Sequence, residues 1–166
     1  MKHSLFFAVF FVVCSFAGCS SSPPELKNLS PVSITVVHDG QPVEDVEVML
    51  FARQPSDIWT CTGRTNSSGT AVMVSTFQQS FAPGAKAGAY AVVLIKPPQL
   101  PEELRPPLPG TVISEKEAAA QRVRRTEFEN KNRVIPKILE AKETTPIELT
   151  VTEKTPAMLT IDVAKY

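Results

Sequence analysis

Apolar and polar residues alternate along several short stretches of the chain, which is the pattern of half-buried β-strands. Residues 32–37 show this alternation, and residues 46–50 resume it after a polar interval. Residues 58–65, 71–76 and 90–95 are three further candidate strands. A period of two places every second side chain on one face of a sheet, so these strands are expected to bury one face each.

Turn signals separate the candidate strands. Asp39-Gly40 is a strong tight-turn pair because glycine accepts positive φ, and the segment Asn66-Ser67-Ser68-Gly69 turns the chain again. Pro83-Gly84 and Gly88 precede the strand at 90–95. Short strands divided by turns at this spacing indicate an all-β sandwich.

The alternation stops after residue 96. Six prolines follow within residues 97–109, and proline cannot donate to a helix or strand ladder, so this stretch is expected to be extended and prone to the polyproline conformation. The favoured interpretation is a spacer or a cover over a sheet edge. A polyproline ligand offered to a partner is the alternative.

A helix is expected after the prolines. Ser114 and Glu117 form a capping box, and the helix that it opens runs to about Lys131. The apolar face of this helix is thin, so we expect it to pack on the edge of the sandwich or to be only partly ordered. That face consists of Ala119, Val123 and Phe128.

Alternation returns at residues 147–151 and 159–163, which look like a closing pair of strands. Residues 97–133 therefore form one Pro-rich and helical insertion before the last two strands. The main strands lie in 31–96, and the closing strands in 134–166 belong to the same sandwich.

The N-terminus has the three parts of a secretory signal. A short basic start is followed by an apolar run over residues 5–13 and then by small residues up to Cys19. The alternative, a permanent transmembrane helix, needs about 20 apolar residues, and this run breaks at Ser15. Residues 1–18 are therefore interpreted as a cleaved signal peptide.

The segment Phe16-Ala17-Gly18-Cys19 resembles the lipobox of bacterial lipoproteins, with Phe16 in place of the usual leucine. The resemblance implies that Cys19 is lipidated and becomes the first residue of the mature chain. Residues 19–30, with a Ser-Ser-Ser-Pro-Pro run, then act as a flexible tether. The protein is expected to be exported and anchored to a membrane through this lipid at the cell envelope, on the periplasmic side or at the cell surface.

Charge and cysteine content limit the possible partners. The chain has 17 basic and 17 acidic residues, so no net field steers it to nucleic acid, and no nucleic-acid partner is expected. Arg122, Arg124 and Arg125 could form a basic patch, but glutamates surround them, which favours a solvated, salt-bridged helix. Cys61 is the one cysteine beyond Cys19, and a buried thiol is preferred over a reactive one.

Residues 31–96 resemble the carboxypeptidase regulatory-like, transthyretin-like domain. The motifs that carry the resemblance are Pro31-Val32-Ser33-Ile34-Thr35-Val36, Asp39-Gly40-Gln41-Pro42-Val43, Val46-Glu47-Val48-Met49-Leu50-Phe51, Gly63-Arg64-Thr65-Asn66-Ser67-Ser68-Gly69-Thr70-Ala71 and Gly88-Ala89-Tyr90-Ala91-Val92. The resemblance implies a seven-stranded Greek-key, prealbumin-like sandwich. Asn66-Ser67 departs from it, since an acidic pair is usual there, and so does the strand at Trp59-Thr60-Cys61.

The tail is similar to that of small lipoproteins from planctomycete bacteria, in which an Ile-Pro step precedes two final strands. The matching segments are Val134-Ile135-Pro136-Lys137 and Thr144-Thr145-Pro146-Ile147-Glu148-Leu149-Thr150-Val151. These are turn-and-strand patterns, so they specify a fold and imply no general activity.

Catalytic chemistry finds little support in the residues. A catalytic zinc site usually has three protein ligands, and the mature chain keeps one histidine, His38, beside a turn, where a solvent-exposed side chain is expected. Transthyretin-like hydrolases rely on several histidines and a characteristic C-terminal tetrapeptide, and residues 162–166 do not match it. We therefore expect no enzyme activity, no cofactor and no metal site.

The predicted function is a non-catalytic structural or binding module at the cell envelope, whose protein or glycan partner is not identified. The alternative is recognition of carbohydrate or peptide by exposed loop aromatics. Trp59 and Phe81 are the candidate ligand contacts, and Phe77 and Tyr90 are further candidates. Burial in the core is the commoner fate of aromatic residues. Exposure of Trp59 and Phe81 on one face would favour the binding hypothesis.

Overall fold

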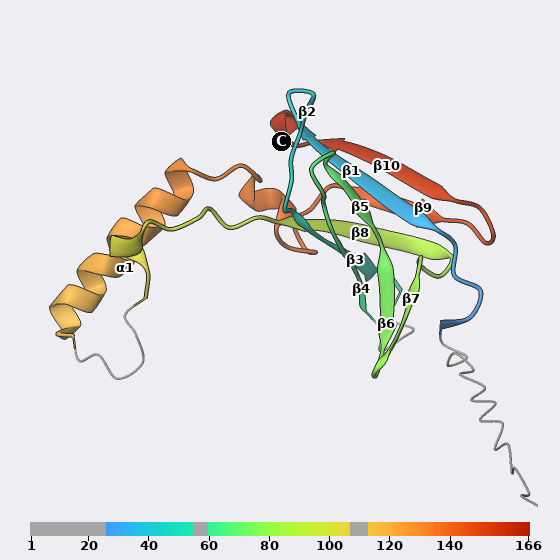
Figure 1. The fold of residues 1–166 in the computed structure, drawn as a ribbon, viewed down its shortest axis with the longest axis horizontal. Coiled ribbons are helices and arrows are strands. Elements are labelled where there is room, and N and C mark those ends of the chain that lie inside the picture. The colour runs from blue at the N-terminus through green and yellow to red at the C-terminus, as the bar shows by residue number, and fades with distance from the viewer. Residues whose placement is uncertain (1–25, 55–59, 107–112) are drawn as a thin grey trace, which may run out of the picture.

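The described residues form a two-layer β structure with one α-helix that stands apart from the sheets (Figure 1). The structure, a computed structural model, describes residues 26–54, 60–106 and 113–166. This architecture confirms the all-β class. The first sheet contains β10 (Ala157–Asp162), β1 (Val32–His38), β2 (Gln41–Pro42) and β5 (Thr70–Val72). The second contains, in order, β7 (Ser80–Pro83), β6 (Val74–Phe77), β4 (Thr60–Arg64), β3 (Glu47–Ala52), β8 (Gly88–Ile95) and β9 (Glu148–Val151).

Strand β1 is the central strand of the four-stranded sheet. It pairs in parallel with β10, from Val32 opposite Ala157 to Val37 opposite Asp162, and antiparallel with β5 and β2 on its other side. Its alternation is borne out, since Val32, Ile34 and Val36 are buried while the residues between them are partly exposed. The first strand therefore behaves as its sequence predicts.

The turns predicted at Asp39-Gly40 and at residues 66–69 both form. Asp39 and Gly40 both have positive φ (50° and 77°), as a tight two-residue turn between β1 and β2 requires. In the second turn, the side-chain carbonyl of Asn66 accepts from the backbone nitrogens of Ser68 and Thr70 at 3.0 and 3.1 Å. Short polar side chains thus replace backbone partners where the chain reverses.

The strand predicted at 71–76 is two strands in different sheets, which corrects the sequence analysis. β5 pairs with β1, β6 pairs with β4, and Met73 lies between them, fully buried. The backbone nitrogen of Met73 donates to Val32 in one sheet, and its carbonyl accepts from Gly84, just after β7 of the other. Alternation continues through this point because the same face stays inward when the strand changes sheets.

Strand β7 was not predicted. It forms a hairpin with β6 in which Phe77 lies opposite Ser80, and Gln78 in the turn has a φ of 53°. Gln78 and Gln79 before the strand and Pro83 within it leave no strand pattern in the sequence. The described ranges therefore hold ten strand segments, some only two or three residues long, and the seven-stranded Greek-key arrangement stays a prediction.

The core fills the space between the two sheets. Fully buried side chains come from both layers and from the tail, and the largest are Ile34, Met73, Leu94, Ile135 and Leu139. Leu139 belongs to the short 3-10 helix η3 (Lys137–Leu139), so the segment that follows the insertion returns into the core. Close packing of this kind makes each of these positions sensitive to volume.

The last two strands do not pair with each other. β9 extends the six-stranded sheet beside β8, whereas β10 joins β1 in the other sheet and leads into the 3-10 helix η4 (Val163–Lys165). The last two strands therefore form neighbouring edges of the two sheets. At the opposite end of the chain, Leu26 is already buried and the hydroxyl of Ser30 donates to Thr152 at 2.7 Å. Leu26 and Ser30, which belong to the segment 19–30 expected to be a flexible tether, are therefore held by the folded part.

Helix α1 (Glu115–Lys131) has the predicted bounds and the predicted capping box. The nitrogen of Glu117 donates to the Ser114 hydroxyl at 3.2 Å, and the Glu117 carboxylate accepts from the Ser114 nitrogen at 3.1 Å. The Ser114 hydroxyl also donates to the Glu117 carboxylate at 2.8 Å, and this bond, together with the one from the Ser114 nitrogen, lowers the pKa of Glu117. The cap satisfies backbone donors that the first turn of any helix leaves unpaired.

The sequence analysis expected the helix to pack on the sandwich edge or to be only partly ordered, and the structure corrects the first of these alternatives, since the helix does not pack there. None of its residues is buried, and Val123 is 58% exposed. It contacts the 3-10 turn η2 (Glu102–Leu104), where Arg125 Nε donates to the Leu104 carbonyl at 3.2 Å. Figure 1 shows the helix projecting from the sandwich, and no helix in the described ranges is long and apolar enough to span a membrane.

Candidate functional site

The predicted site residues have different outcomes. Cys19 and Trp59 lie outside the described residues, so their predicted roles stay predictions. Phe81 is 77% exposed, as a ligand contact would be. Tyr90 is buried, and its hydroxyl donates to the Lys86 carbonyl at 2.9 Å, so it serves the core and is removed from the candidates. Phe77 is half-buried.

Phe81 belongs to an uncharged surface on the outside of the six-stranded sheet, which we call the outer face. Cross-strand pairs place Phe81 opposite Thr76, and Thr76 opposite Thr60. A second row runs from Pro83 through Val74 and Thr62 to Met49 and Val93. Of these apolar side chains, Phe81 and Pro83 are exposed, Val74 and Met49 are partly buried, and Val93 is buried, so the β7 end of the outer face is the candidate binding surface.

The geometry of the central strands explains why the outer face is apolar. In β3, Val48 and Leu50 point into the core, so Met49 and Phe51 point outward. Met49 lies opposite Val93 and Phe51 opposite Ala91, and Val93 and Ala91 are both buried although they face away from the core. Strand β8 is therefore apolar on both faces, as its unbroken run from 90 to 95 would allow.

Charged groups lie at the margin of the outer face that is formed by the end of β3 and by β9. Arg53 and Glu148 form an ion pair at 3.0 Å, and Lys142 Nζ lies 5.9 Å from the centroid of the Phe51 ring. A shallow hollow of about 250 Å³ lies between Phe51, Arg53, Lys142 and Glu143. Glu47 and Arg64, opposite each other at the other end of β3 and β4, are charged as well, so a partner would meet apolar area between two charged margins.

A larger hollow of about 650 Å³ lies where the insertion leaves and rejoins the sandwich. Phe128 and Val134 line it together with Lys96, Asp45 and Glu44. Its polar groups bond within the chain, since Lys96 donates to the Glu44 carbonyl and Asp45 pairs with Arg64. We therefore place the candidate site on the outer face and not in this hollow.

Cys61 is a buried thiol, as predicted. Its Sγ lies 3.7 Å from the carbonyl oxygen of Gly84, and burial raises its pKa to about 11 although the Ser75 hydroxyl acts in the opposite sense. At neutral pH the side chain is therefore the neutral thiol, which is the unreactive form.

His38 lies beside the first turn and is half-exposed, as predicted, with Nδ1 3.4 Å from the Asp39 carboxylate. In the part of the chain that the structure describes, no cluster of three or more His, Cys, Asp or Glu side chains is arranged to hold a metal ion.

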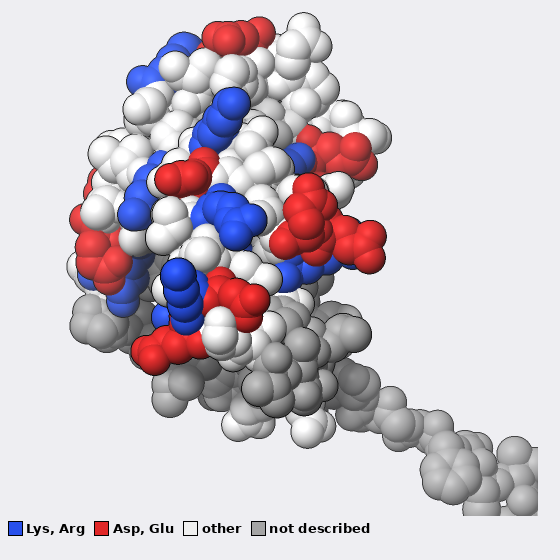
Figure 2. All heavy atoms as spheres, turned by 90° about the vertical axis from the view of Figure 1, so that its left-hand side faces the viewer, with Lys and Arg blue, Asp and Glu red and all other residues white. Residues whose placement is uncertain are grey.

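Charges of both signs share the surface that carries the helix. Seen from the helix side, Lys and Arg are interspersed with Asp and Glu (Figure 2). The stretch around Arg122, Arg124 and Arg125 is thus part of a mixed surface, as the solvated-helix interpretation expects.

Sequence reasoning missed most of the outer face. Met49 and Phe51 were assigned to an ordinary half-buried strand, and Val74 to a strand with a single inward face. A usable signal was the apolar residue at every position of Tyr90 to Ile95, because a strand without a polar face needs cover on both sides.

Comparisons with known proteins do not extend the site. No family model matches the chain, and neither the curated proteins nor the solved structures contain a match. The resemblance to the carboxypeptidase regulatory-like domain therefore stays a prediction.

Proposed function

We propose that this protein is an exported lipoprotein, anchored to a membrane by lipid on Cys19, whose transthyretin-like Greek-key sandwich serves as a non-catalytic structural or binding module at the cell envelope. The observation that carries the binding role is the β7 end of the outer face, where Phe81 is 77% exposed on the same face as Pro83. Contiguous exposed apolar surface on a folded protein often marks an interaction site.

The chain path supports the anchoring role. Leu26, the first described residue, is already buried, and residues 20–25 lie between it and the proposed lipid site in the chain. The chain enters β1 at one end of the sandwich, and β8 leads into the insertion at the other end (Figure 1). Anchored in this way, the sandwich would lie next to the bilayer and the helix would point away from it.

Labelling of native cells with a palmitate analogue tests the anchor. The unaltered chain should take up the label and fractionate with membranes, and Cys19→Ser should lose both properties. Cys14→Ser is the matched control, because Cys14 leaves with the signal peptide and its loss should change nothing. Recovery of a soluble chain with Met1 intact would contradict the proposal.

A second candidate function is recognition of carbohydrate or peptide by exposed aromatics, and the exposure of Phe81 favours it. An aromatic ring offers a flat apolar surface to the faces of sugars and to peptide side chains. In this function Trp59, which directly precedes Thr60 in the chain, would add a second aromatic ring.

Binding of the purified mature protein to envelope glycan fragments and to peptides tests this role. Phe81→Ala should weaken binding roughly tenfold, the usual effect of truncating a contact residue near the centre of an interface. Val72→Ala is the control, because Val72 is 63% exposed on the other sheet. Equal affinity of the Phe81→Ala variant and the unaltered protein would argue against the outer face.

A further inference from the structure

Strand β10 forms an open edge of the four-stranded sheet. Among the described residues its one strand partner is β1, and the nitrogen of Ala157 donates to the Pro31 carbonyl on that side at 2.9 Å. Backbone groups alternate in direction along a strand, so Leu159 and Ile161 also face β1. The amide groups of Met158 and Thr160 then point away from the sheet, toward the open side.

This edge lacks the features that usually prevent strand addition. Charged side chains, prolines and bulges are the common protections of an edge. The other sheet ends in β7, which contains Pro83, and in β9, whose Glu148 pairs with Arg53. β10 is longer than either of them, and its first charged residue is Asp162 at its far end.

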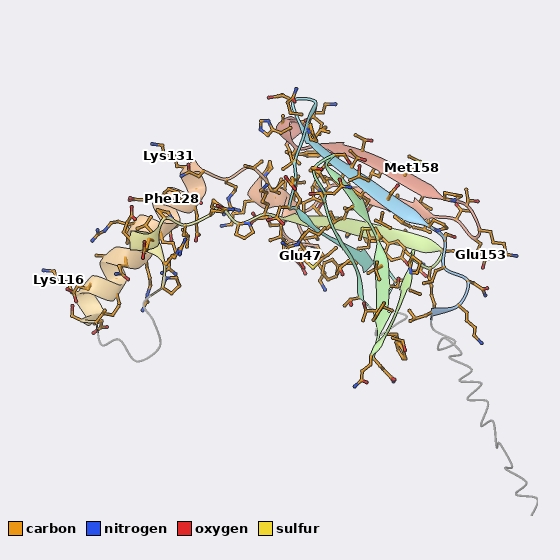
Figure 3. The ribbon with its side chains drawn as sticks, in the orientation of Figure 1. Glu47, Lys116, Phe128, Lys131, Glu153 and Met158 are labelled. Carbon is orange, nitrogen blue, oxygen red and sulfur yellow. The ribbon has the colours of Figure 1, made fainter. Side chains whose placement is uncertain are left out.

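The side chains of β10 show what a partner would cover. Ile161 is buried, but Ala157 and Leu159, which point to the same face, are only half-buried at the margin of the core. On the outward face Met158 is 82% exposed and points away from the sandwich (Figure 3). An added strand would complete the burial of Leu159 with one face and meet Met158 with the other.

We propose that the edge of β10 binds an extended segment of another protein, which joins the four-stranded sheet as a further strand. Its inward side chains would be apolar, to cover Ala157 and Leu159, and its outward side chains would be small or polar except opposite Met158. Main-chain hydrogen bonds to Met158 and Thr160 would supply affinity, and the alternating side chains would supply specificity.

The length of the edge favours such a segment over a second copy of this chain. The residues of β10 span about 20 Å at the usual rise of a strand. Two copies joined by this edge alone would bury far less than the roughly 1,200 Å² of total area at the lower bound of stable interfaces. A short extended segment needs only the strand and its flanking side chains.

Capped synthetic peptides of alternating threonine and an apolar residue (Val, Leu or Phe), with a lysine at each end, are the probes. At least one should bind the mature protein and slow amide hydrogen exchange at Met158 and Thr160. The matched variants are Thr160→Lys on β10 and Thr150→Lys on β9, both exposed threonines on edge strands. Thr160→Lys should weaken peptide binding by roughly tenfold or more, because a charge blocks the edge, and Thr150→Lys should leave it unchanged.

Methylated peptides test the hydrogen bonds directly. One peptide is methylated on its threonine nitrogens and another on its apolar-residue nitrogens, so each lacks the donors of one edge. Binding should survive in one of them and disappear in the other. The proposal is overturned if no peptide of the panel binds, or if both methylated forms behave alike. It is also overturned if protection of Met158 and Thr160 rises with protein concentration alone, since a second copy would then occupy the edge.

Discussion

Gly84 joins three parts of the structure. Its carbonyl accepts hydrogen bonds from the Ser75 hydroxyl at 2.6 Å and from the Cys61 thiol at 3.7 Å. Its φ is +102°, and a Cβ atom there would lie 2.3 Å from the carbonyl oxygen of Ser30. That oxygen accepts from the Ala85 nitrogen at 2.9 Å, so the residue beside Gly84 ties the entering chain to the six-stranded sheet.

Substitution of two glycines should separate backbone strain from steric clash. Gly40→Ala should lower the free energy of unfolding by about 1 kcal/mol, because Gly40 has a φ of +77° but open space around it. Gly84→Ala should cost more, about 3 kcal/mol, because the added methyl group meets backbone that is held by hydrogen bonds. Urea unfolding of both variants measures the difference, and equal costs would show that the Ser30 segment yields without loss.

At the level of single elements, α1 depends on its cap more than on its packing. Since no residue of the helix is buried, the hydrophobic effect contributes little to its stability. The reciprocal hydrogen bonds of Ser114 and Glu117 therefore contribute an unusually large share of the stability of the helix.

Ser114→Ala should reduce the helix signal in far-ultraviolet circular dichroism, with a loss of about 1 kcal/mol in helix stability. Acid should have a related effect. The pKa of Glu117 lies below its ordinary value because the Ser114 hydrogen bonds favour the carboxylate. Their contribution is complete above the ordinary carboxyl pKa and is lost as the pH falls through the lower, folded-state value.

Thr126→Ala is the control substitution, because Thr126 is an exposed residue in the middle of α1 and caps neither end. A helix signal in Ser114→Ala that equals that of Thr126→Ala at neutral pH would contradict the role of the cap.

Elements with local signals could be predicted from the sequence, and those set by distant partners could not. The turn at Asp39-Gly40 and the capping box at Ser114 are specified by neighbouring residues, and both form as expected. The change of sheet at Met73 depends on pairing with β1 on one side and β4 on the other, which alternation alone does not encode. The same holds for the parallel pairing of β1 with β10.

The candidate site was predictable only in part. The sequence identifies Phe81 as an aromatic residue near turns, but its exposure follows from the register of β7 on β6, and β7 itself was not predicted. The rest of the outer face requires knowing which side of the six-stranded sheet faces the core. Tyr90 shows the converse, since an aromatic with a hydroxyl proves to be buried.

At the scale of the whole molecule, the insertion is an appendage whose two ends lie close together. Lys96 and Pro97 at its start line the same hollow as Asn132 and Val134 at its finish. The residues that follow it are different, because Ile135 and Leu139 are fully buried in the core.

Replacement of residues 99–132 by a short Gly/Ser linker should therefore leave the sandwich folded, with a change of no more than about 1 kcal/mol in the free energy of unfolding. Ile135→Ala in the unaltered chain should instead cost about 2–5 kcal/mol, as other large-to-small core substitutions do. Urea unfolding compares the two. A linker variant that unfolds as easily as Ile135→Ala would show that the insertion supports the sandwich.

The parallel pairing of β1 with β10 also has a consequence for the order of assembly. Val32 can pair with Ala157 only after the 124 residues between them have been synthesised, so β10 is the last strand to join this sheet. Until then Ile34 and Val36 lack their neighbours on that side, and a pairing of such wide sequence separation is slow to close. The four-stranded sheet therefore cannot be completed until the last strand, β10, has been synthesised.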